Sequence, residues 1–89
     1  MDVFGIAAFR SRQQVLKYEE IFTRSGIAAQ VVSTPREIAA GCGLSIRFSM
    51  NDLQKVQSAL ARTRPTNLIG LYQLERQSNG RTTVRVIAK

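Results

Sequence analysis

Histidine is absent from this chain of 89 residues. Without an imidazole, the usual general base, the histidine-paired nucleophile and the common histidine-containing zinc site are all excluded. The sequence also lacks a glycine-rich phosphate loop. We therefore expect no metal centre, no organic cofactor and no enzyme that carries out hydrolysis alone.

Cysteine occurs once, as Cys42, so the chain cannot form an intrachain disulfide. A small fold without disulfides suits a reducing compartment, which favours a cytoplasmic location. Long hydrophobic runs are also missing, because the longest, residues 3–9, is far too short to cross a bilayer. This run has neither the basic leader nor the cleavage site of a signal peptide. We expect no association with a membrane.

Acidic residues are scarce: six stand against thirteen basic ones, of which ten are arginine, and the net charge is +7. Arginine favours planar, bidentate contacts with carboxylates or phosphates. An acidic partner, a nucleic acid and a merely solvated basic surface all fit this charge. RNA-recognition domains of related topology need stacked aromatic residues on their central strands. Residues 44–48 contain only one aromatic residue, so the sequence disfavours nucleic-acid binding.

The hydrophobic pattern and the start and stop signals predict an alternation of strands and helices. Strand patterns cover residues 2–9, 27–33, 44–50, 69–76 and 81–87. Helix start signals occur at Ser11, Thr34 and Asn51, and Gly26 and Pro65 mark where the first and last of these helices stop. The helix after Thr34 has room for only one or two turns, because Gly41 follows closely. The dipeptide Asn79-Gly80 predicts a hairpin turn before the last strand.

This order predicts a single α+β domain over residues 1–89. It matches the ferredoxin-like βαββαβ pattern, an antiparallel sheet with two helices on one face, and adds a C-terminal hairpin strand. Strand 2–9 is apolar on both sides. We therefore expect its second side to be covered by another subunit of a homo-oligomer or by the last hairpin.

The single cysteine lies between Gly41 and Gly43, where both neighbours lack side chains and another backbone or sulfur atom can approach closely. A thiol with the reference pKa of about 8.5 is mostly protonated at neutral pH, and nearby cations favour the thiolate. Arg36 and Arg47 are the candidates for this role. The negative end of the short helix would oppose it. A buried, inert cysteine in a turn remains the alternative.

Several segments of the chain together resemble the bacterial selenium/sulfur carrier-like family over roughly residues 3–74. The most specific part combines Pro35-Arg36-Glu37-Ile38 with Cys42-Gly43. The segments that carry the resemblance are Phe9-Arg10-Ser11, Ser25-Gly26-Ile27, Ser33 to Ile38, Cys42 to Phe48 and Gly70-Leu71-Tyr72. Two features depart from the family pattern. Ala39 and Ala40 replace a small polar residue before Cys-Gly, and residues 77–89 extend past the usual end.

The resemblance implies a carrier that holds sulfane sulfur or selenium on Cys42 as a persulfide or perselenide, rather than an enzyme acting alone. Pro35, Arg36 and Gly43 match motif positions and would shape the loop, while Gly41 and Arg47 complete the candidate site. Such a carrier needs a persulfide donor, for example a cysteine desulfurase, and an acceptor protein. The alternative is a module of the same fold that binds a small ligand or a protein without covalent chemistry.

Overall fold

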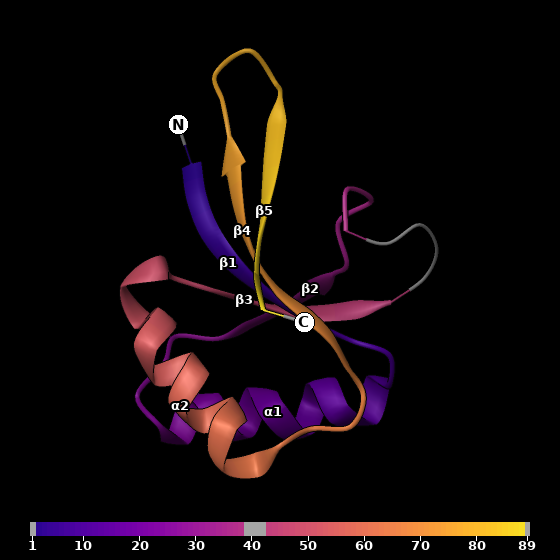
Figure 1. Ribbon diagram of the computed structural model, residues 1–89, viewed down its shortest axis with the longest axis vertical. Coiled ribbons are helices and arrows are strands. Elements are labelled where there is room, and N and C mark those ends of the chain that lie inside the picture. Colours follow the sequence, from indigo (N-terminus) through magenta and orange to yellow (C-terminus); the bar gives the residue numbers. More distant parts are fainter. Residues whose placement is uncertain (1, 39–42, 89) are drawn as a thin grey trace.

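The computed structural model describes residues 2–38 and 43–88, and Figure 1 shows the strands and the two longer helices in the order expected. The elements are β1 (Asp2–Phe9), α1 (Arg12–Arg24), β2 (Gln30–Ser33), β3 (Leu44–Phe48), the 3-10 turn η1 (Met50–Asp52), α2 (Leu53–Thr63), β4 (Leu68–Arg76) and β5 (Thr82–Ala88). The predicted α+β class is confirmed, with a five-stranded antiparallel sheet and two α-helices among the described residues.

The strands are arranged in the order β2-β3-β1-β4-β5, and each neighbouring pair is antiparallel. Ala8 near the end of β1 lies opposite Ser45 near the start of β3. Ser33 at the end of β2 lies opposite Leu44. The register therefore brings the end of β1, the end of β2 and the start of β3 to one end of the sheet.

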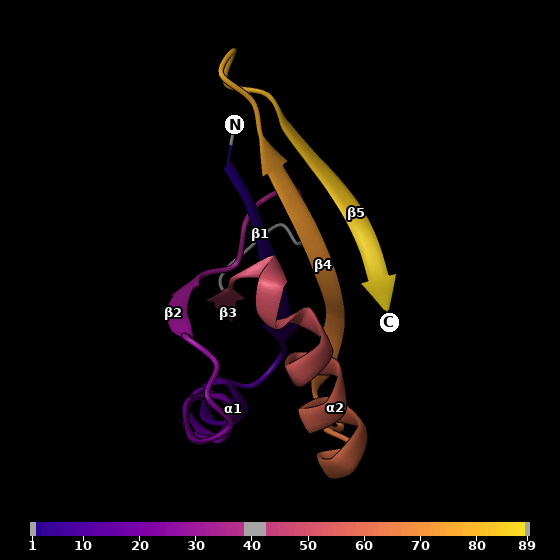
Figure 2. The same ribbon diagram turned by 90° about the vertical axis from the view of Figure 1, so that its left-hand side faces the viewer.

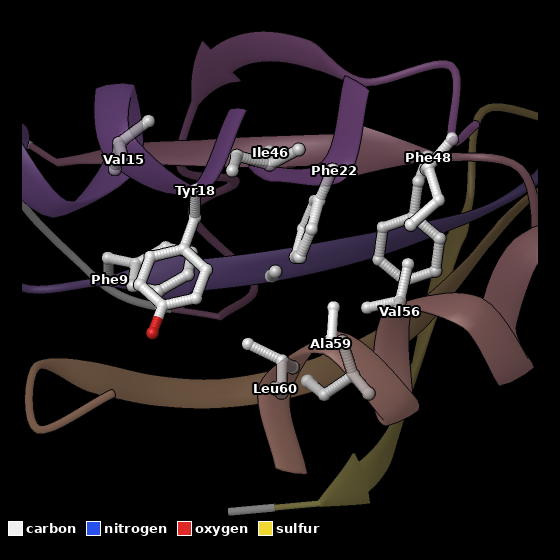
Figure 3. Close-up of a cluster of buried hydrophobic side chains, with 12 residues drawn as sticks. Phe9, Val15, Tyr18, Phe22, Ile46, Phe48, Val56, Ala59 and Leu60 are labelled. Carbon is white, nitrogen blue, oxygen red and sulfur yellow. The ribbon is translucent and has the colours of Figure 1, made fainter. Parts of the chain in front are cut away.

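Both helices contribute their buried side chains to one hydrophobic cluster on one face of the sheet (Figure 3). The Phe9 and Tyr18 rings stack with their centroids 5.1 Å apart, which joins β1 to α1. A Cβ on Gly5 would collide with the Phe48 ring, so the missing side chain lets this ring lie on β1. Each large apolar side chain buried here contributes about 1.5–3 kcal/mol. The cluster contains Ala7, Phe9, Val15, Tyr18, Phe22, Ile27, Ile46, Phe48, Val56, Ala59, Leu60 and Leu71.

The opposite face of the sheet carries a second buried cluster, which we call the second-face cluster: Phe4, Ile6, Ala8, Tyr72 and Leu74. None of these five side chains is more than 5% exposed. Figure 2 shows the curved sheet from the side, with the β4–β5 hairpin extending beyond the helices. Partly buried residues of the same chain pack against the cluster, namely Val32, Ile38, Ile69 and Val84. The last hairpin thus contributes Val84 to this cluster from within the sheet, where β5 is the edge strand beside β4, and Ile38 of the β2–β3 connection also packs against the cluster.

The first helix ends in a way that shortens the next strand. Gly26 takes φ of +82°, and its N–H donates to the Thr23 carbonyl while the Ile27 N–H donates to the Phe22 carbonyl. This is the Schellman closure of a helix. Because Ile27 belongs to the closure and is buried in the core, β2 begins only at Gln30 rather than at Ile27 as predicted.

The second helix begins later than its predicted start signal at Asn51. Ser49 provides the cap, since its hydroxyl accepts the Asn51 N–H at 3.2 Å and the chain passes through η1 before α2. Asp52 precedes α2 without a capping side-chain bond. Arg64 then takes the left-handed conformation and ends the helix just before Pro65, as expected.

Candidate functional site

The connection between β2 and β3, which contains the Cys42 position, is closed at its neck by two bonds. The Thr34 N–H donates to the Gly43 carbonyl at 2.9 Å and so continues the β2–β3 ladder by one residue pair. The Thr34 hydroxyl lies 2.6 Å from the Ser45 hydroxyl, and both residues are buried. Because a buried hydroxyl without a partner is costly, this pair fixes where the two ends of the connection lie.

The short helix predicted after Thr34 is not present in the described part of this connection. Residues 36–38 form a turn, closed by the Ile38 N–H donating to the Pro35 carbonyl at 3.0 Å. The Thr34 hydroxyl bonds Ser45 instead of capping a helix. We expected the negative end of a short helix to disfavour the Cys42 thiolate. Residues 35–38 contain no such helix.

Gly43 has a packing role in this neck. A Cβ at Gly43 would lie 3.1 Å from the Thr34 Oγ1 atom, which is tighter than ordinary contact. Glycine lets the Thr34 side chain reach Ser45 beside the strand. We expected another backbone or a sulfur atom to approach the glycines beside Cys42 closely. At Gly43 the close neighbour is instead the Thr34 side chain of the same chain.

Beside the neck lies an open hollow of about 620 Å³, which we call the arginine hollow. Its lining comes from the end of the sheet where β1, β2 and β3 meet, together with the start of α1 and the turn after Thr34. The lining residues are Arg10, Arg12, Ser33, Thr34, Arg36, Gly43 and Leu44. Figure 1 shows the start of α1 and the turn that follows β2 on the same side of the molecule. Segments distant in sequence thus contribute to one concave surface.

Three arginine residues line this hollow, and no described lining residue is acidic. The ion pairs found within residues 2–38 and 43–88 lie elsewhere: Arg24 with Glu20, Arg47 with Asp2 and Lys55 with Asp52. Arg12 is also the first residue of α1, whose N-terminus carries partial positive charge. The hollow is therefore a concentrated region of positive potential that favours an anion.

The structure brings together some of the predicted site residues. Arg36 and Gly43 line the arginine hollow, and Pro35 lies in the turn beside Arg36. Arg47 is not brought there, because its guanidinium lies 3.9 Å from the centroid of the Phe4 ring and 3.1 Å from the Asp2 carboxylate. Gly41 and Cys42 lie outside the described residues.

Two lining residues, Arg10 and Arg12, were not among the predicted site residues. Both follow β1 directly, and Arg10 is anchored by its N–H, which donates to the Asn67 carbonyl at 2.7 Å. Their position after an apolar strand was visible in the sequence. Their proximity to Arg36 depends on β3 lying between β1 and β2, which the local pattern does not reveal.

Within the part of the chain that the structure describes, no three His, Cys, Asp or Glu residues are grouped so that they could hold a metal ion. In that same part, no helix is both long and apolar enough to span a membrane. The described lining residues include no pair of a nucleophile and a base.

A family of proteins described as "Putative Se/S carrier protein-like" matches residues 4–72 of the chain. The matched region runs from β1 into β4 and contains all the lining residues of the arginine hollow as well as the Cys42 position. Comparison with curated proteins and with solved structures gave no match. Because the matched region covers most of the chain, the protein belongs to this selenium/sulfur carrier-like family.

Proposed function

We propose that the protein carries sulfur or selenium on Cys42, as a persulfide or perselenide. Membership of the carrier-like family supports this function. One structural observation supports the carrier function in addition to family membership. Gly43, the residue bonded to Cys42, lies on the rim of the arginine hollow. The hollow supplies three cations, and a persulfide carries a negative charge that they would stabilise.

Covalent geometry supports the link between the thiol and the hollow. Consecutive Cα atoms lie about 3.8 Å apart, so Cys42 is tethered to a residue of the rim. Cations close to a cysteine favour its thiolate. Hydrogen bonds from arginine to an anion are also stronger than those between neutral groups. In this proposal Arg36 keeps its predicted role, and Arg10 and Arg12 take the place that we first gave to Arg47.

The transfer is a thiol–persulfide exchange. The Cys42 thiolate attacks the terminal sulfur of a donor persulfide, a new sulfur–sulfur bond forms at Cys42, and the donor bond breaks so that the donor thiolate leaves. The terminal sulfur anion then lies beside the guanidinium groups until an acceptor thiolate attacks it in the same way. No external oxidant is consumed, because sulfane sulfur is only passed on. The selenium reaction has the same balance.

As partners we propose a persulfide donor of the cysteine desulfurase class and an acceptor protein with a nucleophilic group. We further interpret the β-α-β-β-α-β order as a ferredoxin-like arrangement extended by β5. In this arrangement the two ends of the β2–β3 connection, Thr34 and Gly43, lie at the sheet end where β1, β2 and β3 meet.

The test is to load the protein with a cysteine desulfurase and cysteine and to measure its intact mass. We expect an adduct of about 32 Da per sulfur atom, removed by a reductant. The same treatment of Cys42→Ser should give no adduct. An unmodified wild type, or an adduct that persists in Cys42→Ser, would contradict the proposal.

A second candidate function is supported by the same hollow: a module that binds an anionic ligand or partner without covalent chemistry. The residues that favour it are the three lining arginines, which can bind an anion whether or not a thiol is present. In this case Cys42→Ser leaves function intact and Arg36→Ala damages it. Carrier chemistry requires the opposite result for Cys42→Ser.

A further inference from the structure

The arginine hollow is larger and more highly charged than a single sulfur atom requires. Its volume of about 620 Å³ is within the range of small-molecule sites, about 300–1,000 Å³. A persulfide brings one negative charge, whereas the described lining residues include three arginines and no acidic residue. The excess of space and of charge points to a second ligand.

The arrangement of the arginines indicates the chemistry of this ligand. One arginine can satisfy a carboxylate with two parallel hydrogen bonds, so a carboxylate does not need three. A phosphate group carries more charge and offers oxygens in several directions, and arginine suits it well. Ser33 and Leu44 also line the hollow, so its lining includes a residue with a hydroxyl group and an apolar residue as well as the arginines.

The backbone that carries the arginines is fixed by local bonds. The Arg10 N–H is bonded to Asn67, and Arg12 opens a helix of 13 residues. Arg36 lies in the turn closed by the Pro35–Ile38 bond. The three side chains therefore start from defined positions around the hollow, and binding has to order only the side chains themselves.

We propose that the arginine hollow binds the phosphate group of a small molecule. Arg10, Arg12 and Arg36 hold the phosphate oxygens, and Leu44 lies beside the group to which the phosphate is attached. This binding needs no covalent chemistry at Cys42. It therefore succeeds or fails independently of the carrier function.

The test is a titration of the ¹⁵N-labelled full chain, followed by amide chemical shifts, with inorganic phosphate and with glycerol phosphate. Chloride keeps the ionic strength constant. We expect shifts confined to residues 10–12, 33–36 and 43–44. Tighter binding of glycerol phosphate would identify an organic phosphate as the ligand, and tighter binding of inorganic phosphate would identify the free ion. Either result supports a phosphate site.

Matched variants separate a built site from general positive charge. Arg12→Gln should weaken binding about tenfold, and Arg12→Lys should recover only part of it because the two parallel bonds are lost. Arg85→Gln removes the same charge from β5, at the edge of the sheet far from β2, and should leave the affinity unchanged. Cys42→Ser should bind phosphate like the wild type.

Three results would overturn the proposal. Equal weakening by Arg12→Gln and Arg85→Gln would show a general charge effect. Amide chemical-shift changes spread over the whole basic surface would also show a general charge effect. A hexaglutamate peptide that bound the hollow residues more tightly than either phosphate would show that the site takes an acidic protein segment instead.

Discussion

At the scale of single residues, the candidate site depends on the contact between Thr34, Gly43 and Ser45. The two hydroxyls are 2.6 Å apart and buried, and Gly43 leaves the space that the Thr34 side chain occupies. Removing one hydroxyl leaves the other buried without a partner, whereas removing both does not. This difference gives a direct test of the neck.

Thr34→Val keeps the side-chain shape but removes the hydroxyl, so we expect it to lower the free energy of unfolding by about 1–3 kcal/mol. Adding Ser45→Ala should recover part of this loss, because the orphaned hydroxyl disappears. Urea denaturation of the single and double variants measures the coupling. Thr83→Val, on the exposed side of β5, is the matched control and should change stability little. Equal effects of Thr34→Val and Thr83→Val would show that the hydroxyl pair does not exist in solution.

Arg47 shows how a plausible site residue is held elsewhere by its own contacts. Its guanidinium lies over the Phe4 ring and bonds Asp2, and Arg76 lies 5.4 Å from the same ring centroid. A cation over an aromatic face gains about 0.5–2 kcal/mol. Arg47 is also three residues beyond Leu44, or roughly 10 Å further along the strand. These contacts keep Arg47 away from the arginine hollow.

At the scale of elements, the sequence was sufficient to predict the order in which the strands and the two α-helices follow one another along the chain. Alternating apolar residues and the Asn79-Gly80 turn mark strands and the last hairpin locally, and Gly80 takes the expected positive φ of +84°. The helix predicted after Thr34 is not present over residues 35–38, where the structure has a turn instead. Its start signal is local, whereas the Thr34–Ser45 bond that replaces the cap spans eleven residues and forms only when β2 pairs with β3.

The candidate site was predicted only in part, for the same reason. Arg36 and Gly43 lie close to Cys42 in the sequence, so a local motif could identify them. Arg10 and Arg12 are far from Cys42 along the chain. They line the same hollow as Arg36 because the sheet order places the ends of β1 and β2 on either side of the start of β3.

The connection between β2 and β3 has a third attachment through Ile38, which packs against the second-face cluster. Ile38→Ala should therefore lower the free energy of unfolding by about 1–2 kcal/mol, below the range for a fully buried isoleucine because Ile38 is only partly buried. It should also reduce the yield of persulfide loading under conditions in which the variant remains folded. Denaturation and intact mass measure the two effects. Leu16→Ala, at an exposed position of α1, is the control. A stability unchanged by Ile38→Ala would show that this attachment is absent.

At the scale of the whole molecule, positive charge is the dominant property. The net charge is +7, and three arginines are concentrated in one hollow at one end of the sheet. Concave regions lined by charge of one sign raise the local concentration of counter-ions and speed their association. The matched family region ends at residue 72, so the hollow lies inside it while the hairpin tip and β5 lie outside.

This charge predicts how the Cys42 thiol reacts with charged reagents. An anionic aromatic disulfide should react faster than a neutral one at low salt, and this advantage should fall as sodium chloride approaches 0.15 M, where the Debye length is about 8 Å. Stopped-flow absorbance measures both rates. Replacing Arg10, Arg12 and Arg36 together by glutamine should remove most of the advantage. A preference for the anionic reagent that is independent of salt would contradict the electrostatic explanation.

The most direct measurement for the carrier function is the rate at which iodoacetamide alkylates Cys42 in the native protein. We expect the folded wild type to react readily at neutral pH, faster than the urea-unfolded chain, and the variant lacking Arg10, Arg12 and Arg36 to react severalfold more slowly. The carrier function would be contradicted if Cys42 were alkylated only after unfolding. It would also be contradicted if replacing the three arginines left the alkylation rate of the folded protein unchanged.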